Sequence, residues 1–195
     1  MSDDPVRVLV VAGSTRWPSY TRSVCDATAA ALVGAGAQVD RWDVAEPLLP
    51  LADPAHHRDP RRYPDPAVRA LVAAAEAADA FVFSTPVYHA SFSGVVKNLL
   101  DHLGFGQTIY KPASLVGHGG RVRNPTAVDQ LRVSLRGLLM VVLPTQVVAA
   151  MGDYDDSGSV SEPEILSRLD RLAHELVAFT AAARPVREQL IARYA

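Results

Sequence analysis

The segment that follows the first apolar run of the chain carries side chains suited to binding an anion. The run itself, Val6 to Ala12, is almost wholly aliphatic and ends at Gly13, as expected of a strand buried on both faces of a parallel sheet. An alanine-rich helical pattern comes next, and the free N–H groups and positive dipole at the start of a helix favour an anion. The segment therefore predicts a phosphate-binding loop, with donors at Ser14, Thr15, Arg16, Ser19, Thr21 and Arg22.

The composition of this loop indicates which phosphate it binds. The GxxxxGK[ST] pattern and the GxGxxG pattern of dinucleotide-binding loops are both absent from it. Gly13 is its only glycine, so hydroxyl groups and the forked guanidinium of Arg16 must do the binding, and these groups suit a monophosphate. An ordinary polar turn, in which Ser19 or Thr21 caps the following helix, is the alternative.

A second segment at a strand end, STPVYHASFSGVVKNLLD at residues 84–101, carries groups that suit a planar ring. Thr85 and Pro86 predict a stiff turn with exposed backbone amides, and Tyr88 offers a flat amphipathic surface. Ser91 or Ser93 can cap the next helix. The alternative is a capped turn whose tyrosine only covers the core.

A third segment, VGHGGR at residues 116–121, follows the next predicted strand. Its glycines allow backbone N–H groups to approach a ligand closely, and Arg121 can place positive charge beside an electron-rich ring. A plain glycine turn is the alternative. Taken with the phosphate loop, these two segments favour a ligand that has both a phosphate and a ring.

Strand-like and helix-like patterns alternate along the chain. This alternation requires right-handed crossovers, with helices on both faces of a parallel sheet. We therefore predict one α/β domain over residues 1–195, with a doubly wound five-stranded sheet of order 2-1-3-4-5, in which the loops after the first and third strands meet at a crevice. The predicted strands are Val6–Ala12, Gln38–Asp43, Ala80–Ser84, Pro112–Val116 and Leu138–Val148, and the predicted helices are Tyr20–Val33, Asp65–Ala77, Ser93–Leu103, Thr126–Arg136 and Pro163–Ala183.

The composition of the chain limits the kinds of partner and the cellular compartment that we expect for it. The formal net charge is -2, without a sustained run of either sign, which gives no support to binding of nucleic acid or of an anionic membrane. No apolar run approaches the roughly eighteen residues of a membrane span, and the acidic start is unlike a signal peptide. Cys25 is the single cysteine and lies in an apolar helical pattern, so it is expected to be buried. We predict a soluble cytoplasmic protein with a small-molecule partner.

Two patterns resemble metal sites, and we expect neither to bind a metal. Adjacent histidines in the proline-rich segment from Pro47 to Pro66 are expected to be solvated in a surface loop without regular structure. A calcium-loop pattern near residue 155 follows a strand rather than a helix, and Ser161 with Glu164 predicts a capping box for the last helix. The residues concerned are Asp53, His56, His57 and Asp59 in the first pattern and Asp153, Asp155, Ser157, Gly158 and Glu164 in the second.

The segments GSTRWPSYTR, TPVYHASFSGVVKNLLD and GHGGR together resemble the NADPH-dependent FMN reductase family of flavodoxin-like proteins. The resemblance implies that FMN and NADPH, or NADH, are the cofactors, and that the chain forms a homodimer or a homotetramer, with the helix beginning TAVDQLR at the dimer interface. His118 stands where a smaller residue is common. By this resemblance the FMN phosphate is held by Ser14, Arg16, Ser19 and Thr21, the ribityl chain and ring are lined by Pro86, Val87, Tyr88, His89 and Ser91, and the pyrimidine edge is contacted by Gly119, Gly120 and Arg121.

The main hypothesis is an enzyme that transfers a hydride from a nicotinamide cofactor to FMN and passes electrons on to a quinone, an azo compound or a partner monooxygenase. The flavin carries the hydride chemistry, so no catalytic side chain is predicted. A flavodoxin-type electron carrier without nicotinamide turnover is the alternative, and a sensor that keeps the fold without turnover is another. The arginine in the phosphate loop and the nearly neutral charge favour the enzyme over the carrier.

Overall fold

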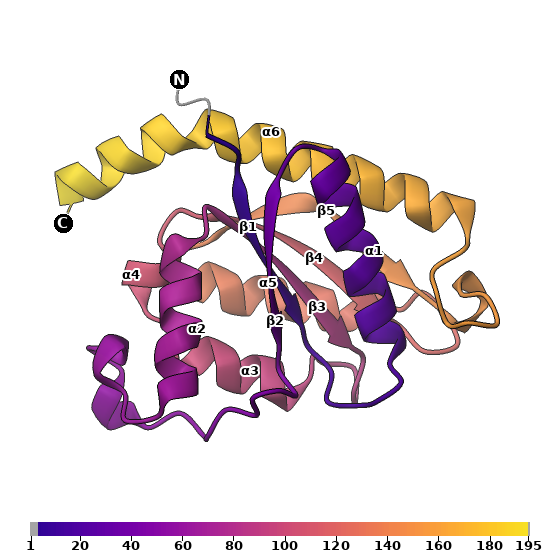
Figure 1. The fold of residues 1–195 in the computed structure, drawn as a ribbon, viewed down its shortest axis with the longest axis horizontal. Coiled ribbons are helices and arrows are strands. Elements are labelled where there is room, and N and C mark those ends of the chain that lie inside the picture. The colour runs from indigo at the N-terminus through magenta and orange to yellow at the C-terminus, as the bar shows by residue number, and fades with distance from the viewer. Residues whose placement is uncertain (1–3, 195) are drawn as a thin grey trace.

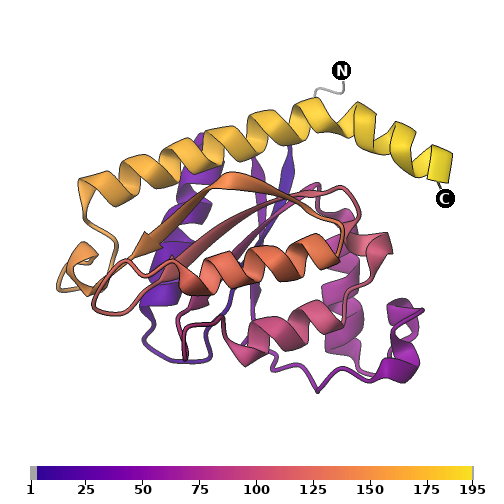
Figure 2. The ribbon, with the colours of Figure 1, turned by 180° about the vertical axis from the view of Figure 1, so that it is seen from behind.

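The computed structural model describes residues 4–194. Within that range, five parallel strands form one sheet of order β2-β1-β3-β4-β5 (Figures 1 and 2). This order is the predicted one, so the prediction of a doubly wound, flavodoxin-like sheet is confirmed. The strands are β1 (Arg7–Ala12), β2 (Gln38–Asp43), β3 (Ala80–Pro86), β4 (Pro112–His118) and β5 (Val141–Ala149).

Helices cover both faces of the sheet because its central strands are apolar on both sides (Figures 1 and 2). Leu9 and Val11 of β1 pack with α2, α3 and α5 on one face, while Val8 and Val10 pack with α1 and α6 on the other. Cys25 is buried in the second of these cores, as predicted. The helices are α1 (Tyr20–Gly34), α2 (Pro66–Ala77), α3 (Gly94–Asp101), α4 (Phe105–Thr108), α5 (Thr126–Gly137) and α6 (Pro163–Tyr194).

The last helix is longer than its sequence pattern predicts. It continues past Ala183 to Tyr194 and contains Pro185, so the predicted end is wrong. Proline removes one backbone donor and usually bends a helix without always ending it. The final turns of α6 run beyond the edge of the sheet (Figures 1 and 2). Within residues 4–194, no helix has the length and apolar character needed to cross a membrane.

Other boundaries differ from the prediction for local reasons. The segment from Pro47 to Pro66 is not wholly irregular, because two short 3₁₀ turns, η1 (Pro54–His56) and η2 (Pro60–Arg62), form within it. Four residues give no periodicity, so the sequence pattern missed α4. Strand β5 starts later than predicted because α5 runs to Gly137 and the turn that follows reverses the chain at Leu139, whose φ is 59°.

The sheet register brings the three polar loops to one edge. Ala12 of β1 pairs with Ser84 of β3, and Pro86 of β3 pairs with His118 of β4. The loops after these three strands therefore leave the sheet side by side, at its carboxyl edge. This edge is where ligands bind in doubly wound folds.

Candidate functional site

Gly13 holds the loop after β1 against the end of β3. Its N–H donates to the carbonyl oxygen of Ser84 over 2.9 Å, and a Cβ atom on it would lie 2.1 Å from that oxygen. The Ser84 hydroxyl donates to the carbonyl oxygen of Thr21 (3.0 Å), and the Ser93 hydroxyl donates to that of Gly13 (2.8 Å). Because only glycine fits at this approach, the two loops are fixed side by side.

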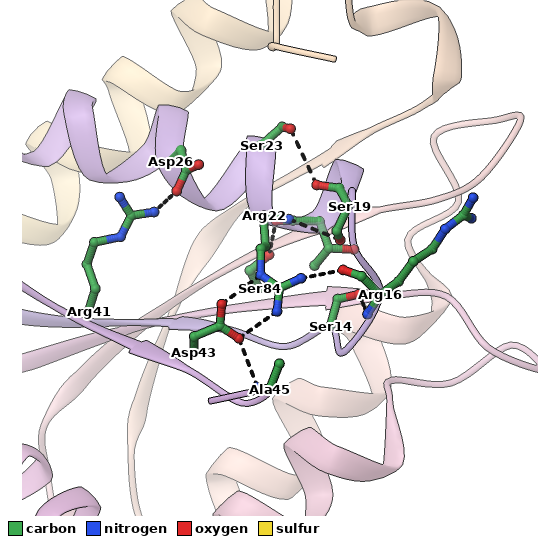
Figure 3. A network of polar contacts seen from close by, with 11 residues as sticks. Ser14, Arg16, Ser19, Arg22, Ser23, Asp26, Arg41, Asp43, Ala45 and Ser84 are labelled. Atoms are coloured by element: carbon green, nitrogen blue, oxygen red, sulfur yellow. Dashed lines mark hydrogen bonds and ion pairs between the residues drawn. The ribbon is translucent and has the colours of Figure 1, made fainter. Parts of the chain in front are cut away.

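Arg22 braces the loop from within and is not available to a ligand. Its guanidinium donates to both carboxylate oxygens of Asp43 at the end of β2, over 2.6 and 2.7 Å, and also to the carbonyl oxygen of Arg16 (Figure 3). Asp43 accepts a further bond from the N–H of Ala45 (2.9 Å). Arg22 is only 8% exposed. The expectation that Arg22 serves as an anion donor is therefore wrong.

Arg16 is the arginine that remains open to a ligand. Its side chain is exposed and turns away from the bonds between Arg22 and Asp43 (Figure 3). Within residues 4–194 its guanidinium makes no ion pair. Ser14 is buried beside it and accepts a bond from the Arg16 N–H (3.2 Å). The loop therefore presents one unpaired cation at the start of α1.

Ser19 has the capping role that the alternative reading gave it. Its hydroxyl accepts a bond from the N–H of Arg22 (3.4 Å), and its backbone is extended, as is usual for the residue that precedes a helix. Thr21 follows within the first turn and is buried. The helix start is thus built in the way that leaves the other N–H groups of its first turn free for an anion.

The segment after β3 forms a tight hairpin that carries Tyr88. Tyr88 and Ser91 exchange backbone bonds of 2.8 and 2.9 Å, and the two residues between them, His89 and Ala90, have φ angles of 49° and 62°. Gln130 of α5 donates to the carbonyl oxygen of Ala90 over 2.9 Å. Left-handed backbone at residues with side chains costs energy and is often found at functional sites. The predicted turn at Thr85 and Pro86 is wrong, because both residues belong to β3.

The glycine-rich segment after β4 turns tightly against β5. The Gly119 N–H donates to the carbonyl oxygen of Ala149 (2.8 Å), and a Cβ atom on Gly119 would lie 2.3 Å from the carbonyl oxygen of Val122. Gly120 has a φ of 85° and accepts a bond from the N–H of Met151 (2.8 Å). Gly119 is therefore needed for packing, and Gly120 for the turn itself.

A cavity of about 710 Å³ lies among these loops. It brings together residues of the phosphate loop, of the β3 loop and of the β4 loop, which the sequence analysis expected to meet. The predicted site residues that line it are Ser14, Arg16, Ser19, Thr21, Pro86, Val87, Tyr88 and Gly120, whereas His89, Ser91, Gly119 and Arg121 are not among its lining residues.

One wall of this cavity is aromatic, and the sequence pattern pointed only to its His118. Tyr20, His118 and Tyr154 form an aromatic cluster with ring centroids 4.5 to 5.5 Å apart, and all three line the cavity. Tyr154 belongs to the connection after β5, which also contributes residues 155–158 to the lining. This connection follows β5 at the same edge of the sheet, and that position is the signal from which its contribution to the cavity could have been predicted.

Burial lowers the pKa of His118, and the nearby charge of Arg16 adds to this effect while Asp153 opposes it. Relative to the unfolded chain, whose histidine pKa is about 6.5, the fold disfavours the protonated ring. The stability due to a neutral ring is complete above about pH 6.5 and is lost as pH falls through the lower pKa of the folded state. Between about pH 7 and about pH 5 we therefore expect the free energy of unfolding to fall more in the wild type than in His118→Gln, as measured by urea denaturation. An equal decrease in the free energy of unfolding in the two proteins would show that the pKa of His118 is not lowered by the fold.

The carboxylates of the calcium-like pattern near residue 155 are bound by the chain's own groups. Asp153 accepts bonds from Arg123 over 2.8 and 3.0 Å, and Asp155 accepts bonds from Ser157 and Ser159. Among residues 4–194, no group of three or more His, Cys, Asp or Glu side chains is placed to hold a metal ion.

The predicted capping box of the last helix is wrong. Because α6 begins at Pro163, Ser161 lies one residue too early to cap it. The Glu164 carboxylate pairs instead with Arg123, over 2.6 Å.

Comparison with known proteins adds the family to this geometry. The model of a family described as NADPH-dependent FMN reductase matches residues 6–154. The NADPH-dependent FMN reductase ArsH of Shigella flexneri is 31% identical over 197 residues, which cover 97% of this chain and 74% of the relative. An FMN-dependent NADPH-azoreductase of Staphylococcus aureus (strain USA300) is 35% identical over 109 residues, or 54% of this chain and 58% of the relative.

A solved structure shows the same fold. The flavoenzyme NAD(P)H:(acceptor) oxidoreductase FerB of Paracoccus denitrificans superposes with a TM-score of 0.72 at 22% identity, covering 91% of this chain and 98% of that one. The family match includes all three polar loops and extends through Tyr154. The chain therefore belongs to the NADPH-dependent FMN reductase family.

Proposed function

We propose that this chain binds FMN in the cavity at the carboxyl edge of the sheet and transfers a hydride to it from NADPH or NADH. The observation that carries the proposal is the placement of the unpaired guanidinium of Arg16 and the start of α1 in the same cavity as Tyr88 and Gly120. One end of the cavity thus suits a phosphate, and the other suits a planar ring. The volume of about 710 Å³ lies in the range of small-molecule sites.

The fit between these groups and FMN assigns a task to each. Ser14, Arg16, Ser19 and Thr21 would hold the phosphate, and Pro86 and Val87 would line the ribityl chain. Tyr88 and Gly120 would flank the ring. His89 and Ser91 shape the hairpin that carries Tyr88, and Gly119 shapes the turn before Gly120. The ring contacts predicted for His89, Ser91, Gly119 and Arg121 stay predictions.

Bound FMN would supply the group that accepts the hydride, so the protein has to bind, orient and exclude water. Tyr88 is 50% exposed, so the part of the cavity that this side chain lines is accessible to a nicotinamide. The half-buried position of His118 lowers its pKa, so the ring is neutral near pH 7 and the wall beside Arg16 adds no second positive charge. The positive charge at the site is thereby concentrated at the phosphate end.

The final electron acceptor would reach the flavin through the same accessible part of the cavity, beside Tyr88. An azo compound, a quinone or a partner monooxygenase would each need access to the ring, and the similarity to a staphylococcal azoreductase favours an azo compound. The aligned region spans only 58% of the azoreductase, so we propose azo reduction for this chain and do not transfer it directly. The rival carrier function requires no nicotinamide site and is disfavoured by the nearly neutral charge of the chain.

We also propose that the chain acts in the cytoplasm as a homodimer or a homotetramer. Apolar side chains are exposed near the cavity and along α5: Tyr88 at 50%, Val122 at 66% and Val133 at 62%. Burial of such residues between copies would complete the site from a partner chain. Light scattering of the purified protein would give the mass of the assembly.

The function is tested by following NADPH absorbance when FMN is added to the purified protein. We expect oxidation of NADPH or NADH that depends on both the protein and FMN. A protein that binds FMN without oxidising either nicotinamide would instead be a carrier or a sensor. A yellow preparation would show a retained flavin, whereas a colourless protein that turns over added FMN would use it as an exchanging substrate.

A further inference from the structure

The aromatic cluster on the cavity wall fixes the protons of His118. The Tyr154 hydroxyl lies 3.2 Å from the carbonyl oxygen of Tyr20 and 3.3 Å from Nδ1 of His118. A carbonyl oxygen can only accept, so both contacts are hydrogen bonds at once when the single hydroxyl proton of Tyr154 is donated to Tyr20. The oxygen of Tyr154 then faces Nδ1 with a lone pair, and Nδ1 must carry the proton that it donates.

This arrangement determines the character of the other ring nitrogen. The half-buried position of His118 favours the neutral ring, which has a single N–H. With that proton on Nδ1, the Nε2 atom is an acceptor on a side chain that lines the cavity. The groups that face this ring are Arg16, Asp153, Tyr20 and Tyr154, and within residues 4–194 none of them forms a hydrogen bond with Nε2.

Tyr154 itself is held in place from two sides. It forms an isolated bridge with Val160, and the preceding Asp153 is 5% exposed and bonded to Arg123 and to the N–H of Ala150. Arg123 comes from the loop after β4, and His118 is the last residue of that strand. The hydroxyl of Tyr154 therefore has a fixed place relative to the histidine, as positioning requires.

We propose that Tyr154 is a positioning residue that holds His118 as the Nδ1–H tautomer, so that Nε2 accepts a hydrogen bond from the flavin. The inference rests on the proposed binding of FMN in this cavity. Phosphate oxygens are acceptors, so the partner of Nε2 must be a ribityl hydroxyl or the ring N3–H group. The His118 contact therefore recognises the part of the ligand that riboflavin and FMN share.

The tautomer is measured first, by nitrogen NMR of the histidines in the flavin-free protein. We expect His118 of the wild type to show a protonated Nδ1 and an unprotonated Nε2. Tyr154→Phe keeps the ring and removes the hydroxyl, so the signals should move toward a mixture of tautomers. Tyr20→Phe is the matched control, because Tyr20 contributes its ring and its carbonyl oxygen, and it should leave the signals unchanged.

Affinity is measured next, by titration with FMN and with riboflavin. His118→Leu should raise the Kd about fivefold for both ligands, as expected for one hydrogen bond. Tyr154→Phe should raise the Kd for both ligands by a smaller factor, because part of the His118 population still has an accepting Nε2. His118→Gln, which returns an acceptor near the Nε2 position, should stay within about twofold of the wild type. A loss confined to FMN would overturn the assignment, since it would place His118 on the phosphate.

Different results would refute the proposed function and the inference about Tyr154 and His118. A wild type that binds neither flavin would refute the proposed function, and the binding role of His118 with it. A wild type that binds FMN, with Tyr154→Phe changing neither the tautomer signals nor the affinity, would overturn this inference alone.

Discussion

Gly13→Ala is expected to destabilise the protein by about 3 kcal/mol and to abolish FMN binding. The added Cβ atom would lie 2.1 Å from the Ser84 carbonyl oxygen and 2.4 Å from a methyl carbon of Val96. The first of these is backbone, and it accepts the Gly13 N–H bond that joins the β1 loop to β3. Relief of the clash therefore has to separate the two loops that form the cavity.

Urea denaturation with and without FMN measures both effects. Gly34→Ala is the matched control, because Gly34 ends α1 and a Cβ atom there meets nothing within 4 Å. That variant should be as stable as the wild type or more stable by up to about 1 kcal/mol. If Gly13→Ala unfolded within about 1 kcal/mol of the wild type, the close approach would not be what holds the site together.

Arg16→Ala is expected to weaken FMN binding by roughly 10-fold to 100-fold. A hydrogen bond to a charged group contributes about 1.5–3 kcal/mol, and about 1.4 kcal/mol corresponds to a tenfold change in affinity. The Arg16 side chain is exposed and its guanidinium braces nothing else among residues 4–194, so the stability of the free protein should not change. Fluorescence titration with FMN gives the affinity.

Riboflavin separates the phosphate from the rest of the ligand. Its Kd should be the same for Arg16→Ala and the wild type, because it lacks the group that Arg16 binds. Arg58→Ala serves as the protein control, since Arg58 lines a separate cavity formed by residues 57–61 and 103–107 with Leu138. Equal weakening of FMN and riboflavin by Arg16→Ala would show that Arg16 does not recognise the phosphate.

The order of the strands was predictable because it follows from the alternation of strands and helices. A parallel sheet with right-handed crossovers leaves few arrangements, and the sheet has the predicted one. The ends of elements were less predictable. Thr85 and Pro86 look like a turn in sequence, yet pairing with Gly117 and His118 of β4 extends β3 through them. The end of the last helix could not be predicted from Pro185 either, because α6 continues through this proline.

The site could be predicted in its location but not in all its members. From the sequence, Arg16 and Arg22 are equally good candidates for binding the phosphate. Only the fold shows that the guanidinium of Arg22 is bound to Asp43, at the end of β2. That partner is remote in sequence, so no local pattern revealed it. Tyr154 was missed for the same reason, because its partners Tyr20 and His118 lie at the start of α1 and at the end of β4, both remote in sequence.

The most direct test of the account is to mix NADPH with the FMN-loaded protein in the absence of oxygen and follow the absorbance of the flavin. We expect the yellow colour to bleach, with one nicotinamide oxidised for each FMN reduced, and NADH to give the same end point if it is also a donor. A flavin that is bound in this cavity and stays oxidised with both nicotinamides would contradict it.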